Sequence, residues 1–98
     1  MELEDLEAIA KKIGWLKAKI EQIRKDLETK RDHGKAILEW ARKIDPCNHA
    51  DIGFMIAYLS KALDEIDDAL KYLDRSIEYA DTAIFVFKEL YPKYHKGD

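Results

Sequence analysis

The chain of 98 residues has little of what β-sheets, disulfide frameworks and membrane spans require. It contains one Val and two Thr, so two residue types that favour strands are nearly absent. Its single cysteine, Cys47, excludes an internal disulfide and suits a reducing compartment. No uncharged stretch approaches the roughly 20 apolar residues of a membrane-spanning helix, and the acidic N-terminus does not resemble a signal peptide. We therefore expect a cytoplasmic protein that does not enter membranes.

The chain also has few amide side chains and no large excess of charge of one sign. One Asn and one Gln accompany 38% charged residues, a composition typical of thermophile proteins. The net charge of −3 provides no basic field for nucleic acid, so we expect no nucleic-acid partner. Leu, Ile, Val and Phe make up about a quarter of the chain, which is enough for a folded core. The abundance of Leu, Ala, Glu and Lys indicates an all-α fold.

Apolar residues recur at alternating steps of three and four along both halves of the chain. Lys30 and Gly34 interrupt the pattern of the first half without changing its phase. Such spacing over many turns is typical of the seam of a coiled coil. The first expected seam contains Leu6, Ile9, Ile13, Leu16, Ile20, Ile23, Leu27, Ile37, Ala41 and Ile44; the second contains Ile52, Ile56, Leu59, Leu63, Ile66, Leu70, Leu73, Ile77, Ala80, Ile84, Phe87, Tyr91 and Tyr94.

Two prolines set the expected boundaries. Pro46 cannot continue a helix, and Pro92 should stop the second one. Gly34 costs about 1 kcal/mol relative to Ala in a helix interior, which leaves a break near this residue open. We expect one domain over residues 1–98, with a helix at about 3–44, a turn at 45–48, a helix at about 49–91 and a tail at 92–98.

The charges predict that the two helices run antiparallel. Residues 11–35 carry a net charge of +5, and residues 61–81 carry −4. If the chain folds back near Cys47, basic side chains of the first segment face acidic ones of the second. Exposed ion pairs contribute little free energy, so they mainly select the orientation of the helices. The expected pairs are Lys17 with Asp81, Arg24 with Asp74 and Arg31 with Asp67.

The second helix has more apolar surface than one neighbouring helix can cover. Two further columns, one rich in small residues and one rich in Tyr, lie beside its seam. We expect the second helix of another copy of the chain to cover them, so that a two-fold dimer forms a four-helix bundle through contact between the two second helices. Alternatively, the stems of Lys12, Lys19 and Trp40 cover the small column. The expected interface contains Met55, Tyr58, Ala62, Ala69, Tyr72, Ser76, Tyr79, Ala83, Val86 and Leu90.

A smaller aromatic patch is expected where the two chain ends meet. Trp15 and Phe85 would form it, either as a partner site or as a lid over the frayed end of the hairpin.

Groups that carry out catalysis or bind metal are few. The four glycines are scattered, so no phosphate-binding loop is present, and no Glu-x-x-His pair marks a carboxylate-bridged metal site. Asp45, Cys47, His49 and Asp51 alternate in the expected turn, but structural zinc sites need more Cys and His. An ordinary Asp- and Pro-containing turn explains these residues, and we expect no metal and no cofactor.

Two short motifs resemble those of known families. Arg42 and His49 are separated by six residues, which resembles the Arg-x(4–6)-His motif of HEPN-type all-helical ribonucleases. That resemblance implies proton transfer by His49 and phosphate binding by Arg42, although Lys43 stands where the motif has a small polar residue. Tyr94-x-x-x-Asp98 resembles the C-terminal pattern of the WXG100 secreted helical hairpins, but their Trp-x-Gly turn is absent here.

These patterns favour a non-enzymatic interaction module: a homodimeric helical hairpin that also binds another protein as an adaptor, inhibitor or assembly factor. The ribonuclease and the secreted hairpin are the alternatives.

Overall fold

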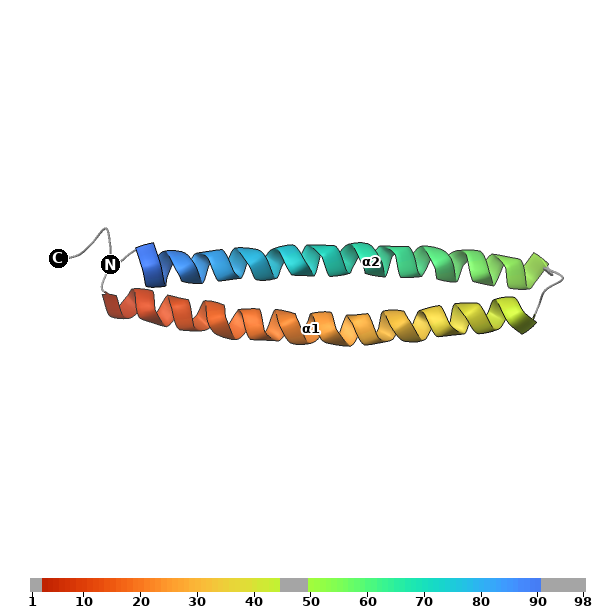
Figure 1. Ribbon diagram of the computed structural model, residues 1–98, viewed down its shortest axis with the longest axis horizontal. Coiled ribbons are helices and arrows are strands. Elements are labelled where there is room, and N and C mark those ends of the chain that lie inside the picture. Colours follow the sequence, from red (N-terminus) through yellow and green to blue (C-terminus); the bar gives the residue numbers. More distant parts are fainter. Residues whose placement is uncertain (1–2, 45–49, 91–98) are drawn as a thin grey trace. The chain divides into compact units, whose positions relative to one another are not determined.

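The computed structural model describes residues 3–44 and 50–90, and all of these residues are helical. Helix α1 spans Leu3–Ile44 and helix α2 spans Ala50–Phe85 (Figure 1). The all-α helical hairpin predicted from the sequence is confirmed, and the bounds of α1 agree with the prediction. His49, the predicted first residue of the second helix, lies outside the described residues.

The end of the second helix differs from the prediction of an α-helix to residue 91. The α-helix stops at Phe85, and a π-helical segment, η1, follows at Val86–Leu90. Backbone hydrogen bonds in a π-helix span five residues instead of four, so each turn is wider. The segment immediately precedes Tyr91 and Pro92, and proline has no N–H to extend the hydrogen-bond ladder.

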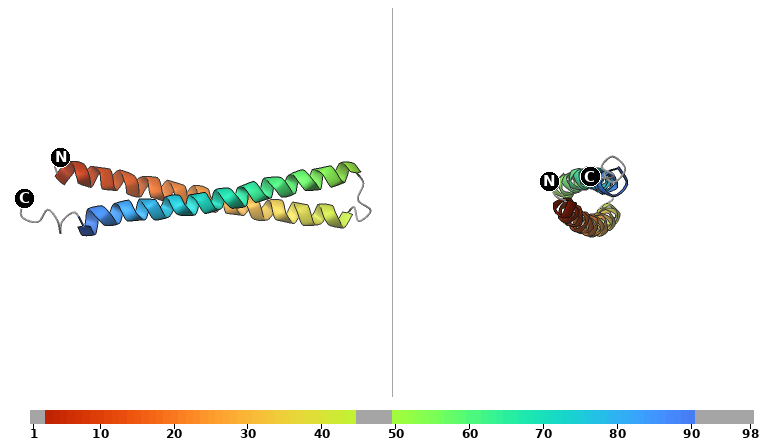
Figure 2. Two further views of the ribbon diagram at one scale, coloured as in Figure 1. Left: turned by 90° about the horizontal axis from the view of Figure 1, so that it is seen from above. Right: turned by 90° about the vertical axis from the view of Figure 1, so that its left-hand side faces the viewer.

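The described residues form two compact units, each built from one segment of α1 and one of α2. Unit 1 combines residues 3–23 with 73–90, and unit 2 combines 24–44 with 50–72. In each unit the two segments lie side by side and run in opposite directions (Figures 1 and 2). Unit 1 contains the red and blue segments, and unit 2 contains the yellow and green ones.

The seam predicted for α2 is confirmed along its described length. Every seam residue from Ile52 to Phe87 is buried or half-buried, as the alternating steps of three and four require. Leu63 and Leu70 are 5% and 4% exposed, and with Leu38 of α1 they are the three buried hydrophobic side chains among the described residues. All three belong to unit 2.

Half of the seam predicted for α1 is wrong. The column that recurs every seven residues from Leu6 to Ala41 faces α2 as expected, but the other predicted column is 43–56% exposed at each of its large apolar side chains. These exposed residues are Ile9, Leu16, Ile23, Ile37 and Ile44. The column one residue later takes their place toward α2, and it contains Ala10, Lys17, Arg24, Arg31 and Leu38.

Gly34 does not break α1; it makes room for a buried leucine. The helix is continuous through this residue. A Cβ atom placed on Gly34 would lie 2.6 Å from Cδ2 of Leu63, closer than carbon atoms can approach. The absent side chain therefore lets Leu63 of α2 pack directly against the α1 backbone in unit 2.

Candidate interaction surface

The interface residues predicted on α2 lie at the protein surface. Met55, Tyr58, Tyr72 and Tyr79 are 65–74% exposed, and Val86 in η1 is also exposed. Among the small residues of the neighbouring column, Ala69 is half-buried. The others described are exposed: Ala62, Ser76 and Ala83. α1 thus leaves the small column largely uncovered. The side chain of Leu90 lies outside the described part of the structure.

In unit 2, an open apolar groove of about 320 Å³ combines residues of both helices. α1 contributes the exposed Ile37 and Ile44 together with Trp40, and α2 contributes Met55. Trp40 is 62% exposed, so it lines the groove without closing it. The remaining lining residues are Ala41, Ile52, Ile56 and Leu59.

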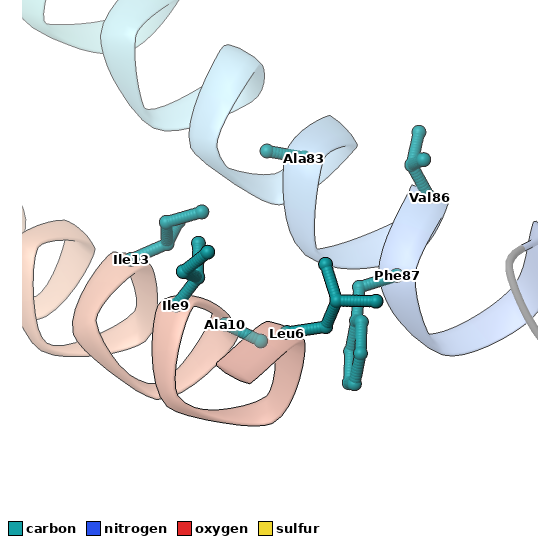
Figure 3. Close-up of a pocket in the computed structure, with 7 residues that line it drawn as sticks. All are labelled: Leu6, Ile9, Ala10, Ile13, Ala83, Val86 and Phe87. Atoms are coloured by element: carbon teal, nitrogen blue, oxygen red, sulfur yellow. The ribbon is translucent and has the colours of Figure 1, made fainter. Parts of the chain in front are cut away.

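Unit 1 has a corresponding groove of about 200 Å³. Figure 3 shows Leu6, Ile9 and Ile13 of α1 on one side, with Ala83 of α2 and Phe87 of η1 on the other. In each unit, therefore, the exposed α1 column borders a groove together with the neighbouring α2 column, through Ala83 in unit 1 and Met55 in unit 2. The predicted α2 residues are exposed at every described position except the half-buried Ala69. Whether they form an interface stays a prediction, and the α1 border of the grooves was not predicted.

The sequence contains a signal that could have identified the exposed apolar column of α1. α2 carries an acidic residue every seven positions at Asp67, Asp74 and Asp81. Acidic side chains at the edge of a seam attract Lys and Arg, whose apolar stems can pack inward while their charged ends remain in water. In the structure the basic residues of α1 lie toward α2, and the Ile column faces outward.

An ion pair lies on the other flank of each unit. In unit 1, Nζ of Lys17 lies 2.5 Å from a carboxylate oxygen of Asp81. Asp81 and Ala83 are two residues apart, about 200° around the helix, so the pair and the groove occupy opposite flanks. The hydrogen bond that Lys17 donates to Asp81 raises the pKa of the ammonium above its ordinary value.

In unit 2, Nη1 of Arg31 donates a hydrogen bond of 3.2 Å to Asp67. Burial alone would lower the pKa of Arg31, but hydrogen bonds to Asp67 and Asp32 hold it above its ordinary value. The residue numbers of both observed pairs add up to 98, which confirms the predicted pairing of Lys17 and of Arg31. The pairing of Arg24 with Asp74 stays a prediction.

The two members of the predicted aromatic patch are both exposed. Trp15 is 64% exposed, and the ammonium of Lys19 lies 5.5 Å from the centre of its ring. This cation–π contact directs Lys19 toward Trp15. Phe85 is the last residue of α2 and is 52% exposed. Whether Trp15 and Phe85 form one patch stays a prediction.

The predicted catalytic pair and turn ligands are not tested. Arg42 lies exposed in the last turn of α1, whereas His49, Cys47, Asp45, Tyr94 and Asp98 lie outside the described residues. Among residues 3–44 and 50–90, no three His, Cys, Asp or Glu side chains gather to hold a metal ion. Neither helix, over that same part of the chain, has a segment of the length and hydropathy needed to cross a bilayer.

No protein family, no curated protein and no solved structure matches the chain.

Proposed function

We propose that the protein is a non-enzymatic interaction module that acts as a homodimer through the exposed columns of α2. The observation that carries this proposal is the 65–74% exposure of Met55, Tyr58, Tyr72 and Tyr79. Tyrosine and methionine are enriched at protein interfaces, where each buries a large area. The dimer also binds a second protein, and it acts on that protein as an adaptor, inhibitor or assembly factor.

The amount of exposed apolar surface supports an interface better than a monomer. Soluble monomers rarely leave large contiguous apolar patches in water. Here the apolar grooves of unit 1 and unit 2 adjoin the exposed columns of α2. Two hairpins that bury such surfaces against each other form a four-helix bundle.

Light scattering over a range of protein concentrations tests the proposal. We expect a molar mass of about twice 11.4 kDa. Ala62→Glu in unit 2 and Ala83→Glu in unit 1 each place a charge on the exposed small column, and each should yield monomers. Ala57→Glu is the matched control, because Ala57 is exposed on another side of α2 and its replacement should leave the dimer intact.

A wild-type chain that stays monomeric at every concentration would overturn the homodimer. The ribonuclease alternative has its own readout, cleavage of single-stranded or structured RNA. Cleavage that disappears in both Arg42→Ala and His49→Ala would show that the protein is an enzyme instead.

A further inference from the structure

We propose that the second copy docks with its α1 against α2 of the first copy, rather than α2 against α2. This inference rests on the proposed homodimer and specifies its arrangement. In it, the exposed Ile and Leu column of α1 packs onto the small column of α2 in the other copy. Each copy contributes both columns, so the interface is formed twice and closes around a two-fold axis.

The exposed side chains suit a second copy of the chain. Leu16 and Ile37 of α1 are 51% and 49% exposed, and Met55 of α2 is 69% exposed. A dimer that covers these side chains in both copies removes apolar surface from water on both sides of the interface.

The sizes of the side chains favour contact between unlike helices. The exposed α1 column is bulky, with Leu16 and Ile37 as examples, whereas the α2 column is small, with Ala83 and Ala62 at the corresponding levels. Large side chains fit between small ones when the columns face each other. Two α1 columns would crowd Ile against Ile, and two α2 columns would leave gaps between Ala side chains.

The charges of the helices favour the same arrangement. α1 carries eleven Lys and Arg against eight Asp and Glu, a net charge of +3. α2 and η1 together carry four basic and nine acidic residues, a net charge of −5. Each ion pair, that of Lys17 and that of Arg31, joins one positive and one negative charge, so the difference in net charge between the helices is unchanged. Contact of α1 with α2 of the second copy brings helices of opposite net charge together, whereas contact between two α2 helices brings together two helices that each carry a net negative charge.

Cross-linking between two singly substituted chains tests the arrangement. Leu16→Cys and Ala83→Cys are prepared separately on a Cys47→Ser background, one with a mass tag, then mixed and oxidised. We expect a mixed disulfide that joins the two chains, since Leu16 of one copy lies level with Ala83 of the other. Ala18→Cys mixed with Ala83→Cys is the control and should cross-link far less, because Ala18 is exposed on another side of α1.

A second variant avoids dependence on cross-linking. Leu16 is 51% exposed in the single chain, so Leu16→Glu should retain the helical content. We expect the dissociation constant of its dimer to rise about tenfold or more, as for a central interface residue. Circular dichroism checks the helix content, and light scattering gives the dissociation constant.

The outcomes separate this inference from the homodimer itself. A dimer that forms no mixed disulfide above the control, or that tolerates Leu16→Glu, overturns the α1–α2 docking and leaves the homodimer standing. A self-disulfide of Ser76→Cys in such a dimer would show α2 against α2. A monomeric wild-type chain overturns both.

Discussion

Units 1 and 2 are built from the same two helices, yet their interiors differ. In unit 2, Leu38, Leu63 and Leu70 are buried. In unit 1, the side chains that face the other helix, such as Ile13, Leu73 and Ile84, are all half-buried. Both units have an ion pair on one flank and an apolar groove on the other, so neither feature explains the difference.

The difference lies in how closely α1 allows α2 to pack. Gly34 lets Leu63 reach the α1 backbone in unit 2. Unit 1 contains Gly14, but a Cβ there would meet nothing within 4 Å, so no side chain of α2 uses the space. Burial in a two-helix unit thus depends on a small residue placed opposite a large one, and the number of apolar residues alone does not determine it.

The largest expected effect comes from truncating matched leucines in the two units. Leu70→Ala in unit 2 should lower the free energy of unfolding by about 2–5 kcal/mol, because it removes a buried side chain and leaves a cavity. Leu73→Ala in unit 1 should cost clearly less, because Leu73 is already partly in water. Urea unfolding at one fixed protein concentration measures both, and equal losses would refute the contrast between the units.

A smaller effect is expected from adding one methyl group to the glycines. Gly14→Ala should stabilise the protein by about 0.5–1 kcal/mol, since Ala favours the helix and the space is empty. Gly34→Ala should instead destabilise it, by up to about 2 kcal/mol, because overpacking of the new Cβ against the buried Leu63 outweighs the same helix gain. Thermal and urea unfolding of the two variants give the sign of each change.

The double variant Gly34→Ala with Leu63→Ala is the control for this explanation. If Leu63 is the obstacle, its truncation relieves the overpacking, and the two changes together cost less than the sum of their separate effects. Additive effects would mean that Gly34 is required for some other reason.

The smallest expected effect is a pH dependence of unit 1. The pKa of Lys17 is raised above its ordinary 10.5 in the folded state, so its stabilisation is complete below that pH. It is lost as the pH rises through the folded pKa. Lys17→Arg stays charged there and should lose less stability between about pH 9 and pH 12. Identical unfolding midpoints of the two proteins across this range would contradict the prediction.

The sequence predicts α2 better than α1 for a physical reason. In α2, the apolar column and the inward column coincide, so the alternating steps from Ile52 to Phe87 identify the seam. In α1, two candidate columns lie one residue apart: one is apolar and contains Leu16, and the other contains Lys17 and Arg31. Hydropathy favours the first, whereas pairing with Asp81 and Asp67 favours the second.

The candidate interaction surface was likewise predicted better on α2 than on α1. Exposure of Tyr58, Tyr72 and Tyr79 could be predicted, because their column lies beside a seam that hydropathy identifies correctly. The α1 border of the grooves, at Ile9 and Ile37, does not follow from hydropathy alone. It accompanies the orientation of α1 in which Lys17 and Arg31 lie toward α2.

The space left by the absent side chain of Gly34 also disfavours a shifted alignment of α1 along α2. The basic residues of α1 and the acidic residues of α2 both recur every seven residues, so a slip of one heptad would still place two of the three basic residues opposite an acidic one. The same slip would place Leu27 or Ala41 opposite Leu63, and either Cβ would occupy the space that Gly34 leaves empty. The charges thus favour the antiparallel direction of the two helices. The absent side chain of Gly34 favours the alignment in which Leu63 lies opposite it.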